Sequence, residues 1–248
     1  MPTAIRRVRP KRSSPGRPEG ESFAREDILN AAEATFAEHG FAGSSLREIA
    51  RGAHVTQALV TYYFGAKDAL FKEVFMRRGR AIADARVTAL AKLTSSGKRY
   101  SLEAVVRAYL APALAMRSTP QGRAFIQLQA RMHTEPPRFA EQLRRGVYDE
   151  VANLFVAAIR KTTPHLSGRA AYWRMILVVG AYLYVHSDSH RLDHVSGGLC
   201  NPDDLEEMLE QITAFVVGGL SAPDPRPRPR PRRIGARNVR PANAIPRP

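Results

Sequence analysis

The sequence predicts an all-α protein, and three observations support this prediction. Apolar residues recur at helical spacing almost throughout residues 22–220. The alternating apolar and polar runs that mark strands joined by hairpin turns are missing from this stretch. Glycine, proline and capping residues fall at intervals that suit helix ends. We therefore expect an N-terminal three-helix domain followed by a larger helical domain.

Three helices are expected in the first part of the chain. The first has its apolar residues on one stripe and ends at Gly40, where glycine suits a helix stop. Ser45 and Glu48 form a capping box that opens a short second helix. After a tight turn, Thr56 caps a third short helix that continues to Phe64. This layout predicts a helix-turn-helix whose second short helix enters the major groove of DNA, although a plain helical bundle has the same spacing.

The remaining helices form a larger set. A long helix is expected from about Lys67 to Lys92, and a loop follows it. Asn201 is expected to cap the last helix, with Pro202 in its first turn. Apolar helices in this number can enclose a ligand cavity. Those expected after the loop span residues 101–117, 120–133, 137–162, 168–187 and 202–220.

The formal net charge of +15 lies mostly at the two ends of the 248-residue chain. Residues 1–22 hold six basic and two acidic side chains, and residues 221–248 hold eight arginines and one aspartate. Twelve of the 18 prolines lie in the same two segments, where they oppose helices and sheets. Such basic segments suit nucleic acid, with an acidic membrane surface or plain solvation as alternatives. We expect disordered tails at 1–22 and 221–248 around a DNA-binding domain at 23–66 and an effector-binding and dimerisation domain at 67–220.

Several classes of protein are disfavoured by what the sequence lacks. The single cysteine, Cys200, excludes an intramolecular disulfide and a multi-cysteine metal site. No run reaches 18 apolar residues and no apolar signal segment follows the basic N-terminus, so we expect a cytoplasmic protein with no membrane partner. No glycine-rich phosphate loop or nucleophile pair is visible, so we expect neither an enzyme nor a cofactor. His186, His190 and His194 are spaced as metal ligands on a continuous helix would be, but we expect a polar loop there and no metal.

Several segments between residues 23 and 75 resemble the TetR family of bacterial transcriptional regulators, of the TetR/AcrR type. Beyond residue 75 the resemblance is to the general plan of that family, an all-helical ligand-binding and dimerisation domain. The resemblance implies a homodimer that binds palindromic double-stranded DNA and responds to a small-molecule effector. The segments that carry it are ILNAAEATFAEHGF at 28–41, SSLREIA at 44–50, VT at 55–56 and YYFGAKDAL at 62–70.

The chain departs from the family pattern at three positions. His54 stands in the turn where the family usually has glycine, and histidine tolerates left-handed backbone better than a β-branched residue does. Thr61 stands where the family often has tyrosine, and Gly65 where it often has proline. The loss of an aromatic ring at Thr61 removes one potential DNA contact, which leaves the operator sequence open.

The third helix supplies the expected base contacts. Gln57 can make a bidentate contact with adenine, and the small Ala58 can meet a thymine methyl group. Arg47 is placed to reach a guanine edge or a phosphate, and Arg17 lies in an AT-hook-like segment that either enters the minor groove or attracts phosphate nonspecifically. Thr56 and Thr61 lie on the same outer face of this helix and are expected to read bases as well. The two serines, the two tyrosines and the lysine are expected at phosphates, with a core place for the tyrosines and a helix-end charge for the lysine as alternatives. The expected DNA-binding residues are Arg17, Ser44, Ser45, Arg47, Thr56, Gln57, Ala58, Thr61, Tyr62, Tyr63 and Lys67.

Candidate ligand-binding residues combine apolar walls with polar tips, and ordinary core positions are the alternative. They are Arg123, Phe125, Gln129, Met132, Tyr148, Phe155 and Trp173. The resemblance implies that the last two helices form a four-helix dimer interface. Its expected residues are Tyr172, Ile176, Val179, Leu183, Leu209, Ile212, Phe215 and Val216.

These expectations combine into a sequence-specific DNA-binding regulator. We expect a repressor in preference to an activator, released from or altered at a palindromic operator by an unknown small molecule. The alternative is an architectural nucleic-acid-binding protein that uses its basic tails without an effector. That alternative predicts loose sequence preference and steep salt dependence.

Overall fold

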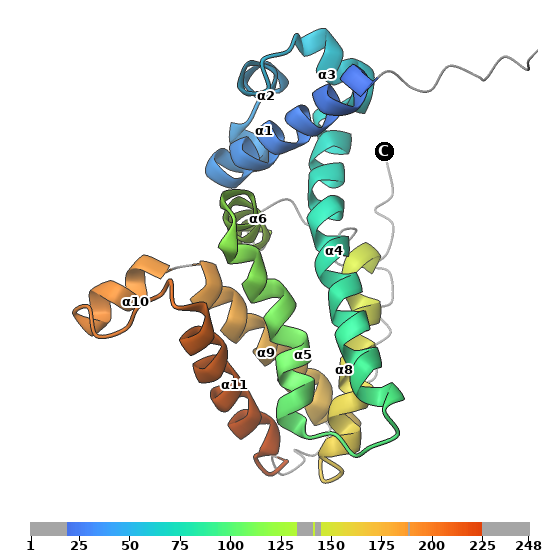
Figure 1. Cartoon of the computed structure of the whole chain (residues 1–248), viewed down its shortest axis with the longest axis vertical. Coiled ribbons are helices and arrows are strands. Elements are labelled where there is room, and N and C mark those ends of the chain that lie inside the picture. Colours follow the sequence, from blue (N-terminus) through green and yellow to red (C-terminus); the bar gives the residue numbers. More distant parts are fainter. Residues whose placement is uncertain (1–18, 133–140, 142–144, 188, 225–248) are drawn as a thin grey trace, which may run out of the picture.

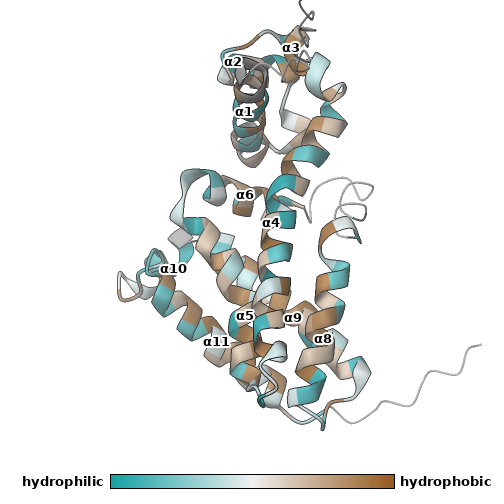
Figure 2. Ribbon diagram, turned by 45° about the vertical axis from the view of Figure 1, so that its right-hand side comes forward, coloured by the Kyte–Doolittle hydropathy of each residue, from teal (hydrophilic) through white to brown (hydrophobic). Residues whose placement is uncertain are grey.

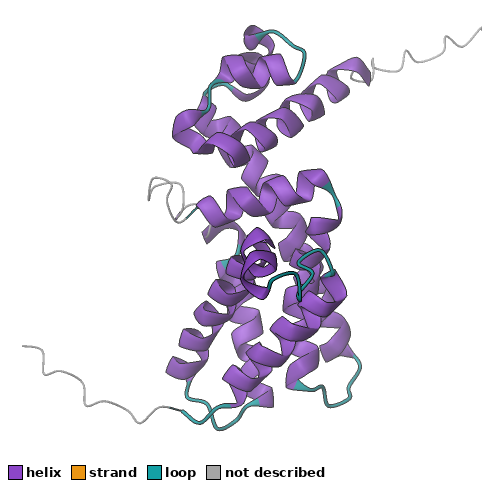
Figure 3. Cartoon of the chain, turned by 90° about the vertical axis from the view of Figure 1, so that its left-hand side faces the viewer, coloured by secondary structure: helices purple, strands orange, loops and turns teal. Residues whose placement is uncertain are grey.

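The computed structural model describes residues 19–132, 141, 145–187 and 189–224. Within these residues the chain consists of helices joined by turns and loops, with no strand (Figure 3). The all-α prediction is confirmed. Within the same residues, no helix is both long enough and apolar enough to cross a membrane.

Three helices form a small N-terminal unit at one end of the molecule (Figure 1). They are α1 (Glu19–Gly43), α2 (Leu46–Gly52) and α3 (Gln57–Phe64). The break expected at Gly40 is present, because this residue has a φ of 69° and kinks the end of α1. Both expected caps are present as well. The Ser45 hydroxyl accepts a hydrogen bond from the Glu48 amide, and the Thr56 hydroxyl accepts one from the Leu59 amide, each at 3.2 Å.

The turn between α2 and α3 contains His54 in left-handed backbone. Its φ of 56° makes it the one non-glycine residue with positive φ in the described part of the chain. A side chain with a Cβ atom has a steric cost in this region, which glycine avoids. The structure thus confirms that the turn keeps its geometry with histidine in place of glycine.

A second group of helices forms a longer bundle below the N-terminal unit, and α4 runs the length of both (Figure 1). A proline, Pro112, lies inside α5, and a short 3₁₀ turn, η1, separates α5 from α6. The elements are α4 (Lys67–Ser95), α5 (Leu102–Leu114), η1 (Ala115–Ser118), α6 (Pro120–Arg131), α8 (Asp149–Thr162), α9 (Gly168–Ser187), α10 (Ser189–Ser196) and α11 (Leu205–Ser221).

Three expectations about helix ends need correction. Residues 189–196 form the short helix α10, not the expected polar loop. The cap of α11 is Asp204, whose carboxylate accepts hydrogen bonds from two amides of the first turn, and not Asn201. α8 begins at Asp149, and most of the earlier part of the helix expected over 137–162 lies outside the described residues.

Aromatic rings anchor the core in both parts of the molecule. In the N-terminal unit the Phe71 ring lies 5.0 Å from Phe36 and 5.3 Å from Phe41, edge to face. In the bundle, Tyr109 packs edge to face on Phe155 at 5.0 Å. Hydrophobic and hydrophilic residues alternate along the helices, as one-sided burial requires (Figure 2). Because Phe71 belongs to α4, the helix that leaves the N-terminal unit also completes its core.

Candidate DNA-binding surface and effector domain

The outer face of α3 is polar and open to solvent. Gln57, Ala58 and Thr61 are exposed on it, while Val60 and Phe64 on the opposite face are buried in the core. The Thr61 hydroxyl donates to the Gln57 carbonyl at 3.1 Å, so the methyl and hydroxyl of this threonine stay close to the helix. The helix therefore presents a short amide-bearing face of the width that a major groove accepts.

Two arginines of α2 flank this face. Arg47 and Arg51 are exposed, and neither forms an ion pair with another residue that the structure describes. Other cations of the same domain form internal ion pairs: Arg25 pairs with Glu73, and Arg77 pairs with Glu33 at 2.6 Å. The two guanidinium groups on α2 therefore remain exposed positive charge that no carboxylate of the described residues neutralises.

Ser44 and Lys67 both form hydrogen bonds within the protein. The Ser44 hydroxyl is buried and donates to the Gly40 carbonyl at 2.6 Å, which satisfies a helix end left open by the kink. The Lys67 ammonium donates to the carbonyls of Phe41 and Ser44 at 2.7 and 2.8 Å, and it lies 4.4 Å from the centre of the Phe41 ring. Lys67 thus ties the start of α4 to the end of α1, whereas the Ser44 hydroxyl bonds only carbonyls of α1. Both side chains have a structural role in the folded chain, and their contact with phosphates stays a prediction.

The other expected DNA-binding residues are distributed around the same end of the domain. Ser45 and Thr56 use their hydroxyls as helix caps and remain exposed. Tyr62 is 76% exposed, and Tyr63 is half-buried with its ring 5.3 Å from that of Tyr62. Tyr62 is therefore not a core aromatic. Arg17 lies outside the described residues.

A buried carboxylate joins the DNA-binding unit to the helix that leads away from it. Glu33 of α1 is 1% exposed and receives Arg77 at 2.6 Å and Arg78 at 3.2 Å, both from α4. A second connection comes from α6, whose Arg131 donates to the Glu38 carbonyl at 3.0 Å. A movement of α4 or α6 therefore acts directly on α1, and through α1 on the position of α3.

Five of the seven candidate ligand-binding residues lie in or beside the interior of the bundle. Phe125, Gln129, Met132 and Phe155 are buried. The Gln129 amide donates to the Tyr148 hydroxyl at 2.8 Å, which brings these two residues together. The other two lie apart from this group: Arg123 is exposed and donates to the Arg117 carbonyl at 2.7 Å, and Trp173 is 63% exposed on the outside of α9.

The bundle interior also holds charged and titratable side chains that the sequence analysis did not select. Arg86 of α4 is fully buried. Burial, followed by the positive charge of Arg117, lowers the pKa of His186 to about 3, so this imidazole is neutral at ordinary pH. Burial also raises the pKa of Tyr109 and of Tyr148 well above the usual value for a phenol. The burial of Arg86 could have been predicted from the sequence, because this arginine occupies an inner position of an otherwise apolar stripe along α4.

One face of α9 and α11 is apolar and open to solvent. Tyr172, Ile176 and Phe215 of the expected interface lie on it, and Val179 and Leu209 are half-buried at its border. The remaining three, Leu183, Ile212 and Val216, are buried against their own chain, and Ile212 also lines the hollow beside this face. The sequence analysis missed Leu177 and Tyr184 on this face and assigned Trp173 to the pocket.

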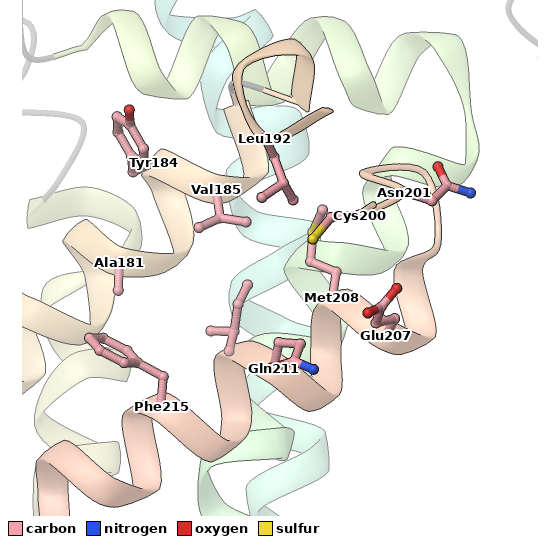
Figure 4. Close-up of a pocket in the computed structure, with 11 residues that line it drawn as sticks. Ala181, Tyr184, Val185, Leu192, Cys200, Asn201, Glu207, Met208, Gln211 and Phe215 are labelled. Atoms are coloured by element: carbon pink, nitrogen blue, oxygen red, sulfur yellow. The ribbon is translucent and has the colours of Figure 1, made fainter. Parts of the chain in front are cut away.

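A hollow of about 680 Å³ continues this face between α9, α10 and α11 (Figure 4). Its walls include Tyr184 and Val185 of α9, Leu192 of α10, and Met208 and Phe215 of α11. Exposed apolar side chains continue along and beyond α10, where Leu199 is 87% exposed. The three helices thus share one continuous apolar surface.

Two of the three histidines considered as metal ligands have described side chains, and the side chain of His190 lies outside the described part of the chain. Within that described part no group of three or more potential metal ligands is found. His186 is buried in the core of the bundle, whereas His194 is exposed on α10. The helix boundary between them separates the two side chains.

Known proteins resemble this chain over both parts of the molecule. Residues 28–74 match the family described as "Bacterial regulatory proteins, tetR family". Residues 107–219 match the domain described as "Tetracyclin repressor-like, C-terminal domain". The HTH-type transcriptional regulator BetI of Agrobacterium fabrum is 26% identical over 208 residues, which cover 83% of this chain and 96% of that protein.

Solved structures share the fold at lower identity. A TetR-like transcriptional regulator from Rhodococcus sp. RHA1 is 23% identical with a TM-score of 0.57, covering 79% of this chain and 96% of its own. The fatty acid degradation regulator FadR from Bacillus halodurans is 14% identical with a TM-score of 0.58, covering 79% of this chain and 98% of its own. Both structures therefore share the arrangement of a three-helix unit on a helical bundle.

Proposed function

The chain belongs to the TetR family of transcriptional regulators, and from that premise we propose that it is a ligand-responsive repressor that binds a palindromic operator as a homodimer. Membership of this family makes it a DNA-binding transcriptional regulator and not an enzyme. The exposed amide-bearing face of α3, held beside two exposed arginines of α2, is the observation that carries the proposal.

The base-reading residues in this proposal are Gln57, Ala58 and Thr61, with Arg47 at a guanine edge or a phosphate. Arg51 at the end of α2 and Tyr62 on α3 are exposed, and we propose that both contact phosphates of the DNA backbone next to the bases that α3 reads. The domains proposed are the DNA-binding unit at 23–66 and the effector and dimerisation unit at 67–220, with basic tails outside them. The proposed location is the cytoplasm, where the operator is.

The homodimer is supported by the apolar face of α9 and α11. Large apolar side chains that are exposed together on a protein surface mark an interaction site. Gly180 of α9 and Gly218 of α11 add to this support, because both are exposed and a Cβ atom there would meet nothing within 4 Å. Glycine inside a helix costs stability, so its presence on this face is explained if another helix approaches closely. A second copy of the same face would place two copies of α3 on one side of the dimer for two half-sites.

The ligand response is supported by the contacts between the bundle and α1. Arg77 and Arg78 of α4 hold the buried Glu33, and Arg131 of α6 holds the end of α1. A ligand that binds between the bundle helices in only one arrangement of α4 would favour that arrangement of α1 and α3. The distance between the two recognition helices would then change, and with it the affinity for the operator.

The test is a selection of bound sequences from a random DNA pool at about physiological salt, using the full chain. The expected result is an enriched palindrome, whose half-sites are separated by about one helical turn or a multiple of it. A ligand response is then measured as a change in affinity for that palindrome. An enriched motif without two-fold symmetry would contradict the homodimer.

The architectural alternative rests on the charge of the two tails. It predicts that no motif is enriched and that binding disappears as salt is added. The same selection, repeated at two salt concentrations, therefore decides between the two functions.

A further inference from the structure

Arg86 lies inside the bundle with its guanidinium between aromatic rings. It is 0% exposed, on the inner face of α4. Its Nε donates to the Tyr109 carbonyl of α5 at 2.8 Å, and its Cζ lies 3.7 Å from the centre of the Tyr109 ring. The ring of Tyr182, from α9, lies 5.4 Å from the same carbon. Three helices therefore meet at this one positive charge.

The other two nitrogens of this guanidinium are buried and unsatisfied. Nη1 and Nη2 have no hydrogen-bond partner among the described residues. No carboxylate of that part of the chain pairs with Arg86, whereas Arg117 of the same bundle pairs with Asp203 at 3.1 Å. A buried charge without a partner of opposite sign is strongly unfavourable, so such groups are normally paired.

The groups around Arg86 cannot supply the missing negative charge. Burial raises the pKa of Tyr109 and of Tyr148, so both phenols stay neutral. His186 is neutral because burial lowers its pKa to about 3. The hydroxyl of Tyr182 also lies near the guanidinium, but it forms no hydrogen bond with Nη1 or Nη2, and a phenol would leave the charge uncompensated. Arg86 itself cannot lose its proton at any ordinary pH.

We propose that Arg86 is the anchor for the carboxylate of a small monocarboxylate effector. The free Nη1 and Nη2 match the two oxygens of one carboxylate, in the paired geometry that guanidinium groups favour. One negative charge balances one positive charge, which favours a monoanion over a phosphate dianion. The rings of Tyr109 and Tyr182 beside the guanidinium favour an apolar or aromatic body for the rest of the effector. This inference rests on the proposed ligand response and names the chemical class of the ligand.

The position of Arg86 also couples a bound ligand to the DNA-binding unit. Arg77 and Arg78 lie two turns earlier on the same helix and hold Glu33 of α1. An anion that draws Arg86 toward α5 and α9 therefore acts on the helix that positions α1. Reciprocity requires that operator DNA and the carboxylate alter each other's affinity by the same factor.

The first experiment measures the melting temperature of the wild-type full chain in low salt with benzoate, and with benzamide as the uncharged control of the same shape. Benzoate is expected to raise the melting temperature in a saturable way, by roughly 5–10 °C at about a hundredfold excess over its Kd. Benzamide is expected to have no effect. If the two compounds change the melting temperature equally, or if benzoate does not change it, the proposal is overturned. This test uses the wild-type chain alone and needs no variant.

The second experiment compares Arg86→Met with Arg80→Met, an exposed arginine of the same helix. Arg86→Met is expected to melt at the same temperature as the wild type or higher without ligand, because it removes an uncompensated buried charge, and to lose the benzoate effect. Arg80→Met is expected to keep that effect. The Tyr109 carbonyl lies inside α5 and retains its intrahelical partner, so the variant leaves it satisfied. A lower melting temperature of Arg86→Met together with an unchanged benzoate effect would make Arg86 a structural residue.

These measurements need no operator, so their failure is separate from failure of the proposed function. If the chain selects a palindrome but benzoate and benzamide act alike, only the carboxylate inference fails. If benzoate stabilises the chain through Arg86 but no palindrome is selected, the proposed operator function fails and the anion site stands. Chloride at the same ionic strength serves as the third arm, and an effect of chloride equal to that of benzoate would show an adventitious anion only and overturn the proposal.

Discussion

Lys67 and Gln57 show how differently two polar residues of the same domain are used. Lys67 is tied to two backbone carbonyls at the end of α1 and holds the domain together. Gln57 is exposed in the first turn of α3, with its side-chain amide free of any hydrogen bond that the structure describes. Both were expected at DNA, and their hydrogen bonds distinguish them, because Lys67 is held by two carbonyls whereas the Gln57 amide is left for a base.

Gln57→Ala is expected to weaken binding to the selected operator by roughly 1–3 kcal/mol, because alanine cannot make the bidentate contact with one base. The preference at one position of each half-site should relax at the same time. The measurement is a titration of the operator and of its single-base variants. Gln121→Ala, at an exposed position of α6, is the matched control. A uniform loss of affinity on all DNA sequences would remove Gln57 from base reading.

His186 predicts a loss of stability in mild acid. Its pKa is about 3 in the folded chain, because of burial and then of Arg117, against about 6.5 in the unfolded chain. The unfolded state therefore binds more protons between these values, and the free energy of unfolding falls as pH drops below 6.5. Between pH 7 and 5 this single group should remove about 2 kcal/mol of stability.

The check is denaturant unfolding of the wild type and of His186→Leu at pH 7 and pH 5. The variant should lose about 2 kcal/mol less than the wild type across this interval, because it has no imidazole to protonate on unfolding. His194→Gln, at an exposed position of α10, should behave as the wild type does. Equal pH dependence of His186→Leu and the wild type would contradict the assigned role.

At the scale of helices, α9 and α11 each carry one buried stripe and one exposed apolar stripe. Leu183 and Ile212 belong to the buried stripes, whereas Ile176 and Phe215 belong to the exposed ones. An apolar pattern predicts that a helix is buried, but when both stripes are apolar it does not tell which one meets its own chain. This is why the expected interface combined residues from both stripes.

Gly180→Glu is expected to convert the proposed homodimer to a monomer, because a charged side chain would enter the closest part of the α9 and α11 face. The mass in solution, measured by sedimentation or light scattering, should fall by half, and operator affinity should fall with it. Ala157→Glu introduces the same charge at an exposed position of α8 and is expected to remain a dimer. If Gly180→Glu forms a dimer of unchanged stability, the dimer interface lies on another surface of the protein.

At the scale of the whole molecule, most of the excess positive charge lies outside the helix that is proposed to contact bases. Residues 23–78 hold seven basic and seven acidic side chains, and several of the basic ones are occupied by ion pairs inside the domain. The first 22 residues hold six basic side chains directly before this domain. We therefore expect the folded unit to supply the specific contacts and the segment before it to supply much of the attraction for the phosphate backbone.

Deletion of residues 1–18 is expected to lower operator affinity and to flatten its dependence on salt, by up to about 0.9 in the logarithmic slope for each phosphate that the segment would otherwise neutralise. The measurement is a titration at several salt concentrations. A variant of full length with glutamine at the six basic positions should match the deletion, because charge and not length is responsible. An unchanged slope in both variants would show that this segment takes no part in binding.

The sequence by itself determined the helices of the N-terminal unit, their caps, the break at Gly40 and the tight turn at His54. It also placed the residues that carry the family resemblance. These features depend on interactions within four or five residues, so their signals are local and survive without knowledge of the packing. The expected start of α11 was wrong because Asn201 and Asp204, three residues apart, are both good caps and their local signals alone do not separate them.

Only the tertiary structure decided which groups are left without a partner. Lys67 is occupied because α1 and α4 meet, and Arg86 is unsatisfied because α4, α5 and α9 surround it without a carboxylate among the described residues. Hydrogen-bond satisfaction and burial depend on residues distant in the sequence, and neither can be read from spacing along one helix. The fold and its reading helix are therefore local properties of this chain, whereas the assignment of each polar side chain to structure, DNA or ligand is a property of how its helices pack.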